Sequence, residues 1–237
     1  MSDGRTRSAW IFGLCLVAGL ALLGYLLGDA ALRVRALERT VTVKGLSERE
    51  YPADQVIWPI QFSRASNDLE ALYAELDGDA GRIRAYLSGR GIGEGEITVS
   101  VPMVTDKLAL QYGGPPSEFR YAGNRTVTVF SGNVEQVRSA MAGLSEVGRQ
   151  GVVLASGFQG ATEYLFTRLN EVKPEMVEEA TRKAREVAQK FAEDSASRLG
   201  KIRNANQGQF VIQSRDNNNP HIKRVRVVST VEYYLSD

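Results

Sequence analysis

The sequence predicts an α+β fold: a mixed, largely antiparallel sheet packed with about three helices, one of them long, preceded by one N-terminal transmembrane helix. Three observations lead to this prediction. An apolar run without charges lies near the N-terminus, strand-like and helix-like stretches alternate unevenly after residue 40, and no repeat of roughly 20–50 residues recurs. With 43% hydrophobic and 24% charged residues among 237, the composition is that of a globular protein.

The first 39 residues are predicted to precede the globular domain. They divide into a short cytoplasmic tail (1–9), a transmembrane signal-anchor (10–28) and a juxtamembrane linker (29–39). The eighteen residues Trp10–Leu27 carry no charge, and as a helix they span about 27 Å, close to the roughly 30 Å of a bilayer's hydrocarbon core. We therefore expect contact with membrane lipid through Trp10–Leu27. A cleaved signal peptide is the alternative, because Gly28-Asp29-Ala30 offers a small-x-small site, although the apolar core exceeds the usual length of about 7–15 residues.

Residues 40–237 are predicted to form one exported domain that opens with two strands and a helix. Thr40–Val43 alternates hydroxyl side chains with valine, the period of a half-buried strand. Val56–Phe62 is the second strand, and Pro59 has no N–H for a ladder, so we expect an edge position or a bulge there. The helix follows apolar positions from Leu69 to Leu87, with a capping side chain at residue 67 or 68.

The rest of the domain alternates strands with one short and one long helix. Asn133 is predicted to cap the short helix. The long helix is predicted from Pro174 to Leu199, with Gly200 as its terminator. Its Ala-rich apolar stripe lets it lie close to a sheet and consists of Val177, Ala180, Ala184, Val187, Ala188, Phe191 and Leu199. Further strands are predicted at 96–105, 119–130, 151–156, 207–213 and 225–235, with a polar hairpin around 113–116 and a turn at 215–220.

Several stretches, in their order along the chain, resemble the SIMPL-domain family. Arg39–Arg49 resembles the family's opening strand. Tyr164–Asn170 and Lys173–Met176 resemble the approach to the family's long helix. The helix itself is resembled by Glu179–Arg185 and Phe191–Ser195. The stretches that resemble its C-terminal hairpin are Gln207-Gly208, Ile212, Arg215-Asp216 and Val225–Tyr233. The resemblance covers about residues 39–237 and is closest to bacterial members with an uncleaved N-terminal anchor.

This resemblance implies an exported α+β domain in the periplasm or cell envelope, with no established enzymatic activity. Some relatives assemble into large hollow rings or cages, and some are linked to oxidative-stress defence. The family has no catalytic motif to transfer to this chain. We therefore expect a single-pass protein of the bacterial inner membrane, with its C-terminal domain in the periplasm.

The residues themselves predict no catalytic, cofactor-binding or metal-ligating site, and no cofactor. One Cys and one His cannot by themselves build a zinc site or an internal disulfide. His221 lies in a turn beside Pro220, where we expect a solvated side chain, and no G-x-S-x-G elbow accompanies it. Asp194, near Ser195 and Ser197, is expected to be structural. The formal net charge of +1 argues against nucleic acid as a partner.

We therefore expect a protein that is not an enzyme and acts by self-assembly or binding. A homo-oligomeric ring is expected, because anchors in one bilayer require cyclic rather than dihedral symmetry. Val56–Phe62 or the C-terminal hairpin would contribute contacts through an open strand edge. Two alternatives stay open. An enclosed polar pocket with acid and base groups would favour a periplasmic hydrolase, and a large apolar pocket would favour a small-ligand carrier.

Overall fold

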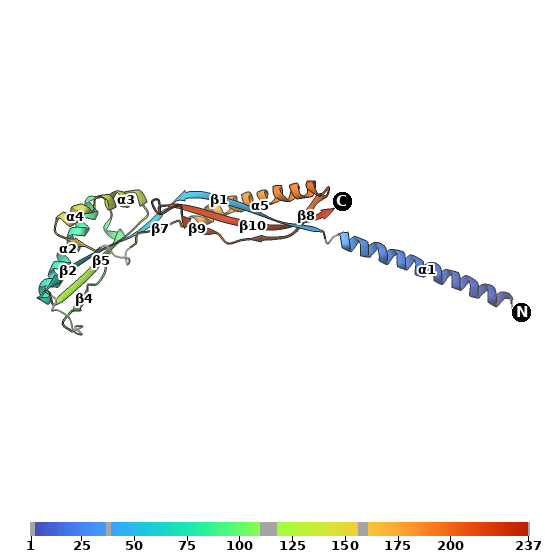
Figure 1. Ribbon diagram of the computed structural model, residues 1–237, viewed down its shortest axis with the longest axis horizontal. Helices are drawn as coiled ribbons and strands as arrows, with labels where there is room; N and C mark the ends of the chain where they lie inside the picture. Colours follow the sequence, from blue (N-terminus) through green and yellow to red (C-terminus); the bar gives the residue numbers. More distant parts are fainter. Residues whose placement is uncertain (1–2, 37–38, 110–117, 156–160, 237) are drawn as a thin grey trace. The chain divides into compact units, whose positions relative to one another are not determined.

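The computed structural model describes residues 3–36, 39–109, 118–155 and 161–236. Helices and antiparallel sheets make up the chain (Figure 1), which confirms the α+β prediction. The chain divides into two compact units. Unit 1 contains Met1–Glu48, Lys173–Phe210 and Arg226–Asp237, and unit 2 contains Arg49–Val172 and Val211–Val225. The predicted hairpin around 113–116 lies outside the described residues.

Helix α1 (Asp3–Ala36) contains the predicted membrane span. Its segment Gly13–Ala30 is long and apolar enough to cross a bilayer, and none of that segment is buried within the protein. Large apolar side chains such as Trp10 and Leu14 are 80% and 74% exposed. Such a surface is stable in lipid rather than in water. A signal sequence has the same length and composition, so retention of the helix stays an expectation.

Unit 2 contains a six-stranded antiparallel sheet covered by helices. Two long strands, β2 (Gln55–Ser66) and β5 (Tyr121–Ser131), pair along their whole length. Short strands flank them: β3 (Ile97–Val99) and β4 (Met103–Asp106) pair with β5, while β6 (Val153–Leu154) and β7 (Glu163–Leu165) pair with β2. The helices are α2 (Leu69–Gly89), α3 (Val134–Ala142) and α4 (Ser145–Arg149), and the turn η1 (Glu94–Glu96) precedes β3.

The core of unit 2 follows the predicted periodicity. Val56, Trp58, Ile60 and Phe62 alternate into the core from β2, and α2 covers them with a buried apolar stripe. Asp68 accepts a hydrogen bond from the Ala71 N–H and so caps α2. Asn133 caps α3 through the Gln136 N–H, as predicted.

Pro59 does not put β2 at an edge of the sheet. Strand β2 is central, with β5 on one side and both β6 and β7 on the other. Pro59 faces Thr128 of β5, while β7 pairs only with residues 55–57 and β6 only with residues 62 and 63. The expected edge is therefore only a local gap between two short strands, where the missing N–H leaves no ladder bond unmade.

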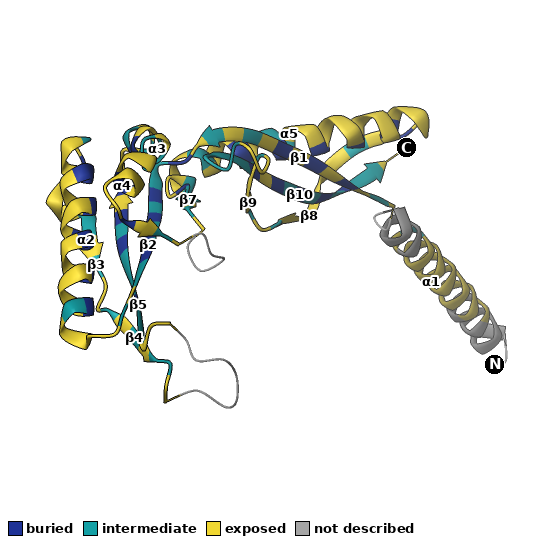
Figure 2. Ribbon diagram, turned by 60° about the vertical axis from the view of Figure 1, so that its left-hand side comes forward, coloured by how far each residue is buried: buried dark blue, intermediate teal, exposed yellow. Residues whose placement is uncertain are grey.

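A second sheet is formed by β1 (Thr40–Pro52), β8 (Arg198–Gln207), β9 (Val211–Ser214) and β10 (Ile222–Ser236). Its order is β1-β10-β8, and β9 also pairs with β10. Strand β10 is therefore internal, and the C-terminal hairpin offers β8 rather than β10 as an outer strand. Figure 2 shows buried and exposed residues alternating along β1 and β10, because one face of this sheet is covered by α5 (Leu169–Asp194).

Helix α5 lies against the sheet of unit 1 through very small side chains. Its buried residues recur every fourth position: Met176, Ala180, Ala184, Ala188 and Ala192. Gly45 of β1 lies beneath them, and a Cβ placed there would come within 1.8 Å of the Ala180 carbonyl oxygen. The predicted close approach is thus correct. Two members of the predicted stripe are exposed, Val187 to 38% and Phe191 to 55%, and two others, Val177 and Leu199, are half-buried.

The limits of α5 differ from the prediction at both ends. The helix begins five residues before Pro174, where Asp54 accepts hydrogen bonds from the Thr167 and Arg168 N–H groups and satisfies donors at its N-terminus. It ends at Asp194, and Leu199 and Gly200 belong to β8 instead. The predicted strand 207–213 is wrong as one strand: β8 ends at Gln207, and residues 211–213 belong to a separate strand, β9, which begins at Val211.

Candidate functional site

The outer strand β8 forms an exposed edge of its sheet. Nine of its ten residues are exposed, and only Leu199 is half-buried. Its described strand neighbour is β10, so one row of its backbone N–H and C=O groups has no strand partner among the described residues. Such an edge is a template for another strand, and natural proteins usually shorten, bulge or cover it.

The hydrogen-bond phase of β8 identifies which groups point outward. The Gly208 N–H donates to the Val228 C=O at 2.9 Å, so this pair faces inward. Asn206 pairs with Thr230 and Ala205 with Val231 in the same register. Because hydrogen-bonded and non-hydrogen-bonded pairs alternate in an antiparallel ladder, the N–H of Asn206 bonds to β10 and that of Ala205 points to the open edge.

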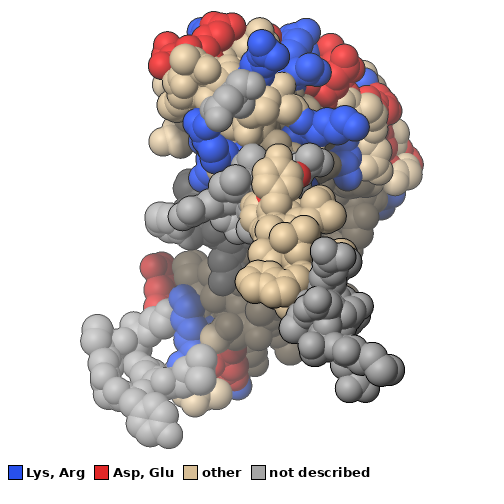
Figure 3. Space-filling view, turned by 90° about the vertical axis from the view of Figure 1, so that its right-hand side faces the viewer, with Lys and Arg blue, Asp and Glu red and all other residues tan. Residues whose placement is uncertain are grey.

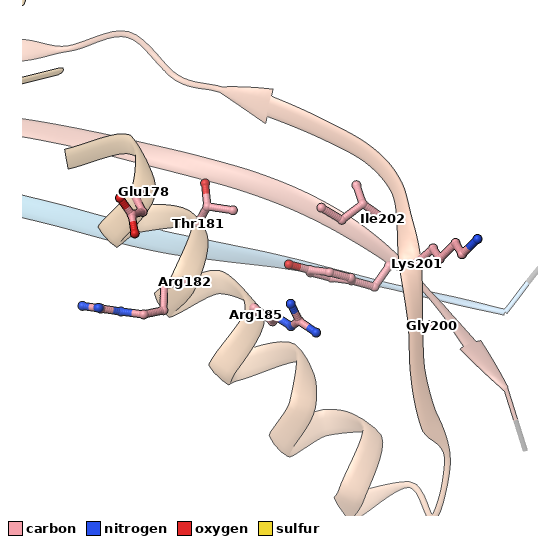
Figure 4. A pocket seen from close by; sticks show the side chains of 8 residues that line it. Glu178, Thr181, Arg182, Arg185, Gly200, Lys201 and Ile202 are labelled. Atoms are coloured by element: carbon pink, nitrogen blue, oxygen red, sulfur yellow. The ribbon is translucent and has the colours of Figure 1, made fainter. Parts of the chain in front are cut away.

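A groove of about 750 Å³ lies beside this strand, between α5 and β8. It is lined by Glu178, Thr181, Arg182, Arg185, Gly200, Lys201, Ile202 and Tyr233. Figure 4 shows Arg185 projecting from α5 toward β8, whereas Lys201 points from β8 away from the helix. The cations are therefore spread along the groove rather than converging on one point, an arrangement that suits an extended contact surface.

Two polar features of the groove are the Tyr233 hydroxyl and the charged side chains of α5. Burial raises the pKa of the Tyr233 hydroxyl, and the nearby Arg185 guanidinium opposes that shift. Arg182 lies 3.9 Å from Glu186 on the exposed side of α5, so this pair contributes little to stability. Tyr233 therefore stays a neutral hydrogen-bond donor at ordinary pH.

Unit 2 carries a buried ion pair that is structural. The side chain of Asp79 in α2 has no exposed surface, and its carboxylate accepts from Arg64 Nε and Nη2 at 2.5 and 2.9 Å. Arg82 donates to the same carboxylate, and Arg64 also donates to the Gly151 carbonyl at 2.7 Å. Both arginines that donate to the Asp79 carboxylate belong to the same fold, Arg64 to β2 and Arg82 to α2. The cluster therefore locks α2 to β2 rather than offering a reactive group.

His221 is held by the fold and is not the solvated loop residue that we expected. It is half-buried, its carbonyl accepts from the Ala53 N–H at 2.8 Å, and its ring lies edge-on to Tyr164 at 6.1 Å. Burial lowers its pKa. Within the described part of the chain, no carboxylate accepts a hydrogen bond from its ring. Asp194 is exposed at the end of α5, where Ser195 and Ser197 make the closing hydrogen bonds.

The surface charge and the metal-ligating residue types of the described chain indicate no site beyond the features above. Figure 3 shows one face on which Lys and Arg side chains alternate with Asp and Glu side chains, so its charge is mixed. Across the described residues, no group of three or more His, Cys, Asp and Glu side chains lies close enough to hold a metal ion. A second groove of about 470 Å³ in unit 2 is lined partly by Arg64, which Asp79 already engages.

Sequence reasoning missed the open edge because β8 has no strand signal. Arg198–Gln207 is rich in Asn and charged residues and lacks the alternation of a half-buried strand. The one available signal was Gly208, which forms the close backbone approach to Val228. A Cβ at that position would lie 2.6 Å from the Val228 carbonyl oxygen.

The comparisons with known proteins identify the family. A family model described as SIMPL, protein of unknown function (DUF541), matches residues 41–231. No curated protein matches the chain. Strand β8 and nearly all of the groove beside it lie within the matched residues. Since this match covers most of its length, the chain belongs to the SIMPL family.

Proposed function

We propose that this protein is a single-pass protein of the bacterial inner membrane whose periplasmic domain acts without catalysis, by self-assembly, in defence of the cell envelope against stress such as oxidation. The observation that carries the proposal is the open edge of β8, exposed along almost its whole length. A ten-residue strand without Pro offers a long row of backbone N–H and C=O groups as a template for another strand. A second copy of the chain provides a cover that is always present.

The chemistry of the described grooves supports binding over catalysis. A hydrolase needs a base within about 2.6–3.2 Å of a nucleophile or of a bound water. Arg64 and Asp79 satisfy each other, and among the described residues His221 makes a backbone hydrogen bond and a ring contact. A carrier needs a pocket that buries most of its ligand. The groove beside β8 is instead open and lined by charged residues.

The mass of the full-length protein in detergent tests the self-assembly. Multi-angle light scattering should give a protein mass several times the 26.0 kDa of one chain. Homo-oligomers held in one bilayer should also show cyclic symmetry by electron microscopy. A monomeric mass at micromolar concentration would refute the proposal.

Reporter fusions to Asp237 test the topology separately. A reporter that is active only after export should be active in cells, and a cytoplasmic reporter at the same position should be silent. The reverse pattern would show that the domain is not exported. A mature N-terminus near Ala31 would show instead that α1 is a cleaved signal, because Gly28-Asp29-Ala30 is the available cleavage site.

A further inference from the structure

The two outer strands of the unit 1 sheet run in the same direction. The Leu235 N–H donates to the Arg39 C=O at 2.8 Å, and the Ala53 N–H donates to the His221 C=O at 2.8 Å, so β1 is antiparallel to β10. Strand β8 is also antiparallel to β10. Strands β1 and β8 are therefore parallel to each other, one at each edge of the β1-β10-β8 order.

Both edge strands start at the end of the sheet that is tethered to α1. Four residue steps separate Ala36, the last residue of α1, from Thr40, the first of β1, and they span at most about 14 Å. Arg39 donates to the Ser197 hydroxyl at 3.3 Å, and Ser197 immediately precedes β8. Both strands therefore run away from the anchor, and in a shared bilayer both run the same way in every copy.

This common direction decides which edges can meet. A two-fold pairing of β8 with β8 of a second copy would be antiparallel and would turn one copy upside down. The two anchors would then leave from opposite ends of a strand pair about 34 Å long, which a single bilayer does not allow. Pairing of β8 with β1 of the next copy is parallel and keeps every anchor on the same side.

The flanks of α5 fit the same arrangement. Successive helical residues are about 100° apart, so Arg185 and Val187 project on opposite sides of the buried Ala184. Arg185 lines the groove beside β8, and Val187 therefore lies on the flank toward β1. Phe191, one turn further on, adds a second exposed apolar side chain there, with 55% of its surface exposed. Head-to-tail contact brings this apolar flank of one copy to the groove of the next.

We propose that the protein assembles head-to-tail: the outer edge of β8 in one copy pairs in parallel with the outer edge of β1 in the next, each edge having no strand partner among the described residues, and Val187 and Phe191 cover the neighbouring groove. This inference rests on the proposed self-assembly and on α1 remaining in the membrane. It names the contact surface and predicts a heterologous, ring-closing interface. The arrangement extends the sheet from copy to copy with α5 on the same face throughout.

Cysteine pairs distinguish this interface from a two-fold one. With Cys15→Ser as background, Asn204→Cys on β8 and Thr42→Cys on β1 both put an exposed thiol on the face opposite α5. Co-expressed, differently tagged single-Cys chains should form mixed disulfide dimers on oxidation, because neighbouring strands lie about 4.8 Å apart, within disulfide reach. Either variant alone should give none. Disulfide dimers of Asn204→Cys alone would overturn the inference.

A proline pair tests the edge itself. Ala205→Pro removes an outward N–H and should lower the oligomer mass in detergent while leaving the unfolding temperature nearly unchanged. Asn206→Pro removes a bond to β10 and should destabilise the fold. An Ala205→Pro oligomer of unchanged mass would overturn the inference while leaving self-assembly intact. A wild-type monomer would instead remove the proposed function itself.

A phenylalanine pair tests the flank of α5. Phe191→Ser should weaken the oligomer, lowering its mass on dilution. Phe130→Ser is the matched control, because Phe130 is 51% exposed on β5 in unit 2, outside this interface. Equal masses for both variants and the wild type after dilution would show that the α5 flank makes no contact between copies.

Discussion

The contact between Gly45 and α5 makes a sharp prediction for Gly45→Ala. The added Cβ would lie 1.8 Å from the Ala180 carbonyl oxygen and 2.5 Å from the Ala184 amide nitrogen. Real Cβ atoms essentially never come closer than 3.0 Å to a neighbour. Both clashing atoms belong to the helix backbone, so a change of rotamer cannot relieve the overlap. The backbone of α5 must therefore move by more than an ångström.

The loss of stability in Gly45→Ala can be estimated from the packing that the movement of α5 disturbs. Inserting a methyl group into a well-packed core typically destabilises a protein by about 1–3 kcal/mol. Here the whole buried Ala stripe of α5 must separate from β1 and β10, so we expect a loss near 3 kcal/mol, at the top of that range. For a chain of this size, that loss lowers the unfolding temperature by about 6–12 °C.

The assay is thermal unfolding of the full-length protein in detergent, followed by near-ultraviolet circular dichroism. Gly78→Ala is the matched control, because a Cβ at Gly78 in α2 meets no atom within 4 Å. That variant should be stabilised by about 0.5–1 kcal/mol, since Ala is the better helix former. If Gly45→Ala unfolds within about two degrees of the wild type, α5 does not rest on β1 at this point.

Three further predictions concern polar groups. Asp79→Ala should lower the free energy of unfolding in urea by about 2–3 kcal/mol, less than a fully buried pair would lose because the Arg64 side chain is 24% exposed; a loss below about 0.5 kcal/mol would contradict the structural role. Ser229→Ala should leave the unfolding temperature unchanged or raise it, because the buried Ser229 hydroxyl has no hydrogen-bond partner among the described residues; a clear decrease would reveal a bond. The Asp216 carboxyl has its pKa lowered from 3.8 to about 2, mainly by its hydrogen bond from Arg215. Its contribution to stability is therefore present above pH 4 and lost as the pH falls through about 2. Arg215→Gln should raise this pKa toward 3.8, as carboxyl carbon NMR would show, and an unchanged pKa would exclude that cause.

Local sequence patterns were sufficient for most of the regular elements. The apolar spacing in α2, the Asn133 cap of α3 and the alternation in β1, β2 and β10 each depend on residues close together in the chain. The Ala-rich stripe also determined that α5 approaches a sheet closely, because the methyl side chain of alanine is too small to hold the backbones apart. Family membership followed from the order of such stretches, each weak by itself.

The candidate site was decided by tertiary structure. Strand β8 lacks alternation and has a single β-branched residue, Ile202, and it is a strand because β10 offers it an open ladder. Whether Phe191 is buried depends on where the sheet ends beneath α5. The helical spacing of apolar residues does not show where that end lies. Which strands have a free edge likewise depends on the neighbours that a strand acquires, as Pro59 in the central β2 shows. The sequence by itself determined the long apolar N-terminal helix, the fold class and the family, since these rest on composition and local order. Long-range pairing alone placed the open edge, because every residue has a backbone C=O acceptor and all except proline have an N–H donor, so strand pairing does not depend on which side chains are present.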